Sequence, residues 1–150
     1  MLTTSIKLCL YVMIIYASYR TDIPAFYGEW FYNRAKEGYL LVRNPMNPHT
    51  VSKIKLDKSV DVIVFCSKNY EPFLPYVKWF NEHFRCYFNY TINAYDGDIE
   101  PHVPSYVRSI ETVNKMIELG VRPQQIAWRY DPILFTENTI CNIINHHLTI

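Results

Sequence analysis

Four short apolar runs, each followed by polar residues, limit the possible folds of this chain more than any other feature of its sequence. They cover about residues 11–17, 61–65, 87–92 and 126–130. Segments with apolar residues at helical spacing separate them, such as the one from Ala25 to Glu37. Strands that alternate with helices indicate βα units and a parallel sheet, because a crossover helix carries the chain back to start the next strand. The sequence therefore predicts an α/β fold, and four such units amount to half of a TIM-like (β/α) barrel.

The pattern within the runs predicts which side chains form the core. The run DVIVF at 61–65 is nearly continuous, which is typical of a strand covered on both faces. We expect a core that contains Trp30, Phe31, Val62, Ile63, Val64, Phe65, Phe88, Ile92, Ile126 and Trp128. Residues 39–45 form an extended piece that ends in turn signals. Residues 51–56 alternate between apolar and polar, as an exposed or edge strand does.

Composition and motifs exclude several classes of function. The 150 residues carry 15 Lys and Arg against 14 Asp and Glu, and this net charge of +1 gives no whole-chain attraction to nucleic acid or to an anionic membrane. Four cysteines are scattered without a CxxC pair, and the adjacent His146 and His147 point to different sides of a regular element, so we predict no metal site. Neither a Gly-rich phosphate loop nor a G-x-S-x-G motif is present, and we assign no catalytic residue.

Polar residues at the ends of the runs mark a candidate site. Right-handed crossovers place the carboxyl ends of parallel strands at one edge of the sheet, where α/β proteins carry their sites. We therefore predict a substrate or cofactor face made of Arg20, Asp22, Arg43, Asn44, Lys68, Asn69, Thr91, Arg129 and Asp131. Its cations could converge into a pocket that binds a carboxylate or a phosphate. The alternative is that Arg20–Asp22 and Arg129–Asp131 are ion pairs within loops, which fix turns.

The N-terminus has two interpretations. Lys7, the apolar residues 8–17 and the small residues after them resemble a secretory signal, although the run is too short to span a bilayer. We interpret residues 11–17 instead as the first strand, and we set residues 1–12 apart as an extension. The expectation is then a cytoplasmic protein without a membrane segment. A mature N-terminus beyond residue 17 would favour a secreted or surface protein.

Four blocks of the sequence carry a resemblance to a known family. In chain order they are ASYRTDIPAFYGEWFYNRAKEGYLLVRNPMNP, DVIVFCSKN, NYTINAYDGDIEPHVP and IAWRYDPILFTE. Together they resemble the bacterial family called domain of unknown function 1848, over about residues 13–137. The chain departs from the family pattern at Tyr19, where an arginine is usual, and at Cys66-Ser67, which replace an aromatic–threonine pair. The loss of that arginine would weaken an anion pocket there.

The resemblance implies more than the residues alone do. Family members are longer, and their C-terminal part carries a cysteine cluster similar to the one that holds the 4Fe–4S centre of radical S-adenosylmethionine enzymes. The implied cofactors are that centre and S-adenosylmethionine, but this chain lacks the cysteine cluster. The expected organisation is an extension at 1–12, the N-terminal half of a barrel-like domain at 13–137, and a divergent or truncated tail at 138–150.

Two functions follow from these observations. The first is an N-terminal fragment of a radical S-adenosylmethionine-type iron–sulfur protein, which supplies part of the substrate face and is inactive alone. The second is a cluster-independent binding module for a small metabolite that bears a phosphate or a carboxylate. A half barrel leaves two strand edges unpaired, so we also expect self-association or pairing with a complementary C-terminal half. Nucleic acid is not an expected partner, because aromatic residues in buried strands belong to the core.

Overall fold

A four-stranded parallel sheet forms the centre of the computed structural model, which describes residues 12–95 and 97–134. Its strand order is β1-β4-β5-β6, and the strands are β1 (Ile14–Tyr16), β4 (Val62–Ser67), β5 (Cys86–Thr91) and β6 (Ile126–Arg129). The predicted α/β fold with a parallel sheet is confirmed, and the described strands form an open sheet rather than a closed barrel. The expected tail at 138–150, and the expected extension apart from Val12, lie outside the described residues.

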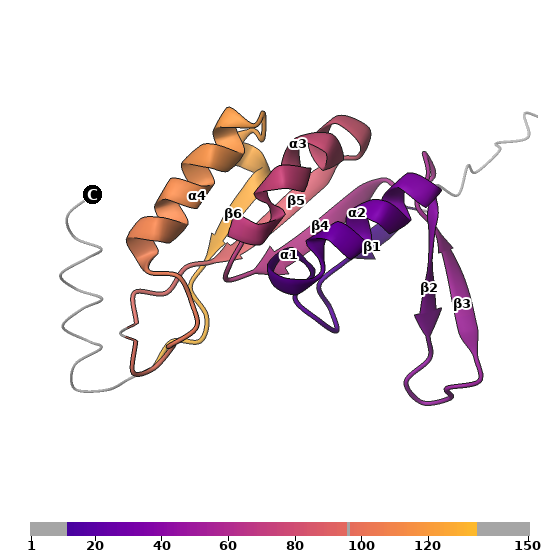
Figure 1. Cartoon of the computed structure of the whole chain (residues 1–150), viewed down its shortest axis with the longest axis horizontal. Helices are drawn as coiled ribbons and strands as arrows, with labels where there is room; N and C mark the ends of the chain where they lie inside the picture. The colour runs from indigo at the N-terminus through magenta and orange to yellow at the C-terminus, as the bar shows by residue number, and fades with distance from the viewer. Residues whose placement is uncertain (1–11, 96, 135–150) are drawn as a thin grey trace, which may run out of the picture.

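Helices connect the strands and lie side by side along one face of the sheet (Figure 1). They are α1 (Ile23–Phe26), α2 (Gly28–Glu37), α3 (Leu74–His83) and α4 (Tyr106–Glu118), with short 3-10 turns η1 (Glu71–Phe73) and η2 (Pro123–Gln125) before α3 and β6. The predicted helix from Ala25 to Glu37 is divided at Tyr27. As the sequence predicted, α2 ends at Glu37, and the next residue, Gly38, has a left-handed φ of 79°. None of the described helices combines the length and the apolar character that crossing a membrane requires.

The segment between α2 and β4 forms a hairpin outside the parallel sheet. In this hairpin β2 (Tyr39–Arg43) pairs antiparallel with β3 (Val51–Lys55), which confirms the exposed strand predicted at 51–56. The hairpin and β6 lie at opposite ends of the molecule (Figure 1). Because β2 belongs to the hairpin, its end does not form part of the carboxyl edge of the sheet.

The core lies between the helices and one face of the sheet. The ring of Phe65 in β4 stacks on Phe88 in β5 with 5.6 Å between centroids. Phe31 of α2 and Phe80 of α3 lie 5.7 and 5.5 Å from the same ring. None of these four side chains is more than 2% exposed. Aromatic packing therefore joins two helices and two strands into one unit.

The prediction that β4 is covered on both faces is wrong. Burial alternates along the strand, so Ile63 and Phe65 are buried whereas Val62 and Val64 are only half-buried. The reason is that the described helices cover a single face. The opposite face, which we call the open face, contains Ile14, Tyr16, Val62, Val64, Cys66, Tyr87, Asn89 and Thr91.

Two residues predicted for the core are exposed. Trp30 on α2 is 45% exposed and Trp128 on β6 is 56% exposed. Trp128 lies on the last strand of the described sheet, and Trp30 borders a groove between α2 and the hairpin. The prediction is confirmed for Phe31, Ile63, Phe65 and Phe88, while the side chains of Val62, Val64, Ile92 and Ile126 are partly buried.

Candidate functional site

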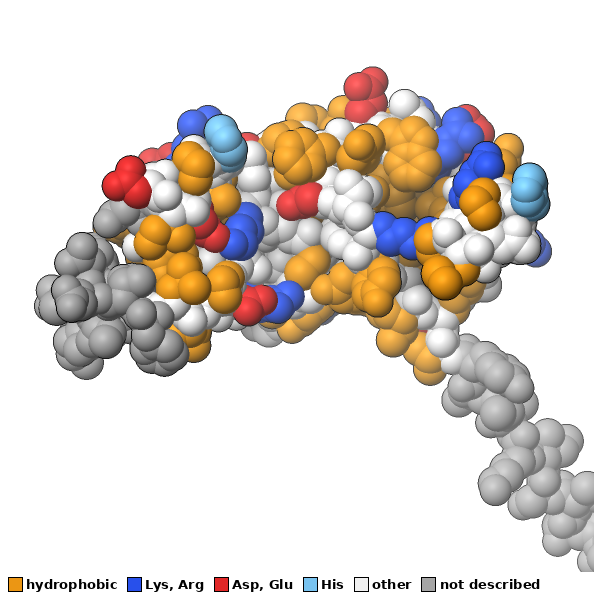
Figure 2. Space-filling model, turned by 90° about the horizontal axis from the view of Figure 1, so that it is seen from below, with side chains coloured by type: hydrophobic (Ala, Val, Ile, Leu, Met, Phe, Trp, Pro, Cys, Tyr) orange, Lys and Arg blue, Asp and Glu red, His pale blue; other side chains and the backbone are white. Residues whose placement is uncertain are grey.

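A hollow of about 440 Å³ opens at the carboxyl edge of the sheet. Its wall is formed by Ser18, Tyr19, Arg20, Thr21, Asp22, Cys66, Ser67, Lys68 and Thr91. Four of the predicted site residues, Arg20, Asp22, Lys68 and Thr91, therefore meet here, as expected for strand ends in a parallel sheet. Figure 2 looks at the molecule from below, the side toward which the strands run, and shows basic and acidic side chains next to one another among hydrophobic ones.

Two hydrogen bonds fix Asp22 at this edge. Its Oδ1 accepts from the backbone N–H of Ala25 at 3.0 Å and caps α1, while its Oδ2 accepts from the Ser67 hydroxyl at 2.8 Å. Burial raises the pKa of Asp22, and these hydrogen bonds counteract part of the rise. Asp22 therefore joins the end of β1 to the end of β4, in place of the ion pair with Arg20 that the sequence offered as an alternative.

Replacing Asp22 with Asn is expected to change how stability depends on pH. Because the folded-state pKa of Asp22 is raised, its contribution to the free energy of unfolding is fully present below the unfolded value of 3.8 and is lost as pH rises through the folded pKa. Asp22→Asn keeps a capping oxygen without the charge, so it should remove this slope, match the wild type in acid and be more stable than the wild type at neutral pH. Asp22→Ala should lose about 1–2 kcal/mol, because the cap is gone.

Urea unfolding between acidic and neutral pH measures both Asp22 variants. Wild-type stability attributable to Asp22 should decline as the pH is raised out of the acid range, and this decline should be absent from Asp22→Asn. If Asp22→Asn is as unstable as Asp22→Ala at neutral pH, the charge of Asp22 stabilises the fold. That result would contradict the prediction that burial of this charge costs stability.

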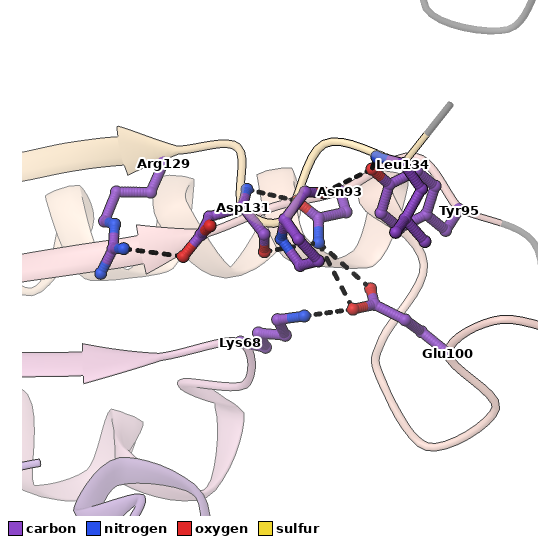
Figure 3. A network of polar contacts seen from close by, with 8 residues as sticks. Lys68, Asn93, Tyr95, Glu100, Arg129, Asp131 and Leu134 are labelled. Atoms are coloured by element: carbon purple, nitrogen blue, oxygen red, sulfur yellow. Dashed lines mark hydrogen bonds and ion pairs between the residues drawn. The ribbon is translucent and has the colours of Figure 1, made fainter. Parts of the chain in front are cut away.

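The loop between β5 and α4 is tied to the same edge through Glu100 and Asn93 (Figure 3). Glu100 forms an ion pair with Lys68, and their side chains are only 14% and 32% exposed. Asn93, which is 5% exposed, donates to the Glu100 carboxylate at 3.3 and 3.4 Å. The same amide group donates to the backbone carbonyl of Asp131 at 3.0 Å, and its oxygen accepts from the Asp131 N–H at 3.1 Å. These contacts link the ends of β4, β5 and β6.

Arg129 contacts two groups at the end of β6. One guanidinium nitrogen forms an ion pair with Asp131 at 2.9 Å, so the loop ion pair considered from the sequence is present. Another donates to the sulfur of Cys66 at 3.4 Å. A hydrogen bond with Cys66 and partial burial raise the pKa of Tyr16, while the charge of Arg129 counteracts the rise. Tyr16, Cys66 and Arg129 therefore form a group next to the hollow.

Three predicted site residues serve local structure instead. Arg43 donates to a backbone carbonyl across the hairpin loop at 3.0 Å, and Asn44 accepts a backbone N–H in the same loop at 2.9 Å. Asn69 accepts the backbone N–H of Glu71 at 3.1 Å, where η1 begins. None of the three lines the hollow.

The predicted face left out several residues of this edge, among them Ser18, Cys66, Asn93 and Glu100. Ser18 accepts the backbone N–H of Cys66 at 3.1 Å, and both residues line the hollow. Ser18 comes directly after the first apolar run, so the rule that selected the other strand-end residues also applies to it. Glu100 lies in a long loop that also contains other acidic residues, and nothing local in the sequence distinguishes it from them.

The described cysteines do not fit the iron–sulfur cluster that the family resemblance implies. Cys66 lies opposite Asn89, three residues beyond Cys86, so the two cysteines are roughly 10 Å apart along the strands and face opposite sides of the sheet. Cys86 is buried, its thiol donates to the carbonyl of Phe80 at 3.5 Å, and burial raises its pKa to about 12. Because cluster ligands are thiolates, these two residues cannot hold one together. Within the described ranges, no three His, Cys, Asp or Glu side chains lie close enough to hold a metal ion.

The sheet and its edge define an α/β protein with a candidate ligand site at the carboxyl ends of parallel strands. The family model described as Domain of unknown function (DUF1848) matches residues 14–149, and the chain belongs to this family. Comparisons with curated proteins and with solved structures find no match to the chain.

Proposed function

We propose that this chain binds a small metabolite that carries a carboxylate or a phosphate, in the hollow at the carboxyl edge. The observation that carries the proposal is the position of Arg20 on the wall of this hollow. Its guanidinium donates to the backbone carbonyl of Arg43 at 2.8 Å, and it takes part in none of the ion pairs between described residues. Since a guanidinium has five N–H donors, an anion in the hollow would meet donors that no carboxylate occupies.

The other polar groups of the wall also favour an anion over a cation. Ser18 accepts a backbone N–H and keeps its hydroxyl proton to donate, and Thr91 adds a second hydroxyl on the open face. The carboxylate of Asp22, in contrast, already accepts two hydrogen bonds. Lys68 is paired with Glu100, so its charge is largely neutralised. The wall therefore presents more donors than acceptors to a ligand.

This proposal also specifies what the chain would contribute to a larger iron–sulfur protein of the kind that the resemblance implies. A four-stranded parallel sheet with a donor-rich carboxyl edge supports a role as the substrate-face half of a barrel. The proposed role is binding alone. We derive no redox step for the described residues, because Cys66 and Cys86 do not fit the cluster.

Thermal unfolding in the presence of inorganic phosphate, and separately of succinate, tests the proposal. A ligand at one hundred times its Kd should stabilise the wild type by about 2.7 kcal/mol. Arg20→Gln should lose most of this stabilisation. The matched control, Arg85→Gln, should keep the stabilisation by the anion. Arg85 is exposed and directly precedes β5, so it lies at the amino ends of the strands, away from the hollow.

A control in sodium chloride at the same ionic strength distinguishes binding of the anion from general screening of charges. If chloride stabilises the protein as much as phosphate and succinate do, the hollow is not an anion site. Equal loss of stabilisation in Arg20→Gln and Arg85→Gln would also contradict the proposal, because it would place the anion away from the hollow.

A further inference from the structure

Both edge strands of the parallel sheet have a single neighbour among the described strands. β1 pairs with β4, and β6 pairs with β5. The backbone N–H of Ala17 donates to Val64 in β4 at 2.9 Å. Because backbone N–H groups alternate in direction along a strand, those of Ile14 and Tyr16 point away from β4. Edge groups of this kind are a template for another strand.

The open face of the sheet also lacks a covering layer in the described part of the chain. Ile14, Tyr16 and Tyr87 on this face are 59%, 43% and 37% exposed. Parallel sheets are almost always covered on both faces, because their strands are apolar on both sides. An apolar sheet face with two incomplete edges therefore indicates that a further part of an assembly covers it.

An apolar groove of about 370 Å³ lies beside the incomplete edge of β1. It runs between this strand, α2 and the hairpin, and its apolar wall includes Ile15, Ala17, Trp30, Phe31, Leu40 and Leu41. Ile15 is in register with the buried Ile63, so the groove lies on the helix side of the sheet. Arg20 and Arg43 also line it.

The strand at the other edge of the sheet, β6, carries the aromatic side chain of Trp128 on the same side of the sheet as the groove. Trp128 of β6 is in register with the buried Tyr90, so it also lies on the helix side, and it is 56% exposed. Its indole N–H donates to the carbonyl of Ile92 at 3.1 Å, which fixes the ring in place. One edge therefore carries an apolar groove with the small Ala17 in its wall, and the other edge carries a large apolar side chain.

We propose that two copies of this chain close an eight-stranded parallel barrel, in which β6 of each copy enters the groove beside β1 of the other. The strand order β1-β4-β5-β6 continues directly into β1 of the second copy, with all strands parallel and a two-fold axis along the barrel. Eight strands give an interior that side chains just fill, so the open face becomes a core.

A second copy accounts for these features better than an unrelated extended peptide does. A peptide in the groove would pair with β1 but would leave the edge of β6 and the open face as they are. A second copy covers both edges and the open face at once. The net charge of +1 per chain gives two copies little reason to repel each other.

Sedimentation velocity of the full chain over a range of concentrations tests the inference. The wild type should approach twice its 17.9 kDa mass as concentration rises. Trp128→Glu and Leu41→Glu change the two sides of the contact, and each should give a monomer, because each contact occurs twice in the dimer. Ile110→Glu on α4 is the matched control: Ile110 is 50% exposed, and this variant should remain a dimer.

Hydrogen exchange of the wild type supplies a second measurement that needs no variant to fold. The backbone amides of Ile14 and Tyr16 should be protected in the dimer and should lose protection on dilution. The inference is overturned by a chain that stays monomeric, by a dimer that survives both edge variants, or by a dimer whose Ile14 and Tyr16 amides exchange freely. Dissociation by Ile110→Glu would point to α4 instead, and continued growth beyond a dimer would show that the edges do not close.

The inference does not rest on anion binding. Trp128 lines neither the hollow nor the groove that Arg20 borders, so a monomeric Trp128→Glu chain should keep its response to phosphate. Loss of association and loss of ligand binding are therefore distinguishable.

Discussion

Phe65→Ala should lower the free energy of unfolding by about 3–5 kcal/mol, the usual cost of removing a buried aromatic ring. Phe65 is fully buried, and its ring centroid lies 4.9 Å from that of Phe73 and within 5.7 Å of Phe31, Phe80 and Phe88. The surrounding rings belong to α2, η1, α3 and β5, so they cannot collapse together into the space. Since a domain is stable by only about 5–15 kcal/mol, the variant should be near its unfolding limit.

Phe26→Ala is the matched control for this prediction. It makes the same change at a side chain that is 76% exposed, so its effect should stay within about 0.5 kcal/mol. Urea unfolding at one fixed protein concentration, followed by tryptophan fluorescence, measures both variants. Similar losses for Phe26→Ala and Phe65→Ala would mean that the aromatic core is not where the structure places it.

Asn93→Ala should cost about 2–3 kcal/mol, because several hydrogen bonds of one buried amide are lost together and their partners stay behind. The backbone N–H and carbonyl of Asp131 and the Glu100 carboxylate all lose a partner. The loop between β5 and α4 should then detach from the ends of β4 and β6. Faster proteolysis within residues 92–105 is expected to accompany the loss of stability.

Asn44→Ala is the control for the Asn93 variant. Asn44 is exposed, and its side chain accepts one backbone N–H in the hairpin loop at 2.9 Å. Its replacement should change the free energy of unfolding by less than about 1 kcal/mol and leave proteolysis of residues 92–105 unchanged. If Asn93→Ala is as mild as Asn44→Ala, the polar network of Figure 3 does not hold the carboxyl edge together.

The secondary-structure elements and the fold class follow from the sequence alone. Apolar runs and helical spacing are local properties, and they predicted the four parallel strands, the helices between them and the end of α2 at Glu37. Chain direction in a parallel sheet then placed Arg20, Asp22, Lys68 and Thr91 at one edge, where the structure also has them. These predictions succeeded because each depends on neighbouring residues or on a general rule of handedness.

The contacts between these elements, in contrast, could not be predicted before the fold was known. Glu100 pairs with Lys68 across 32 positions and Asn93 contacts Asp131 across 38, and no local pattern marks such partners. The hairpin removes Arg43 and Asn44 from the predicted face, and the position of β6 at the edge of the sheet leaves Trp128 exposed. The physical reason is that secondary structure follows from local periodicity, whereas burial and polar pairing depend on which distant surfaces the fold brings together.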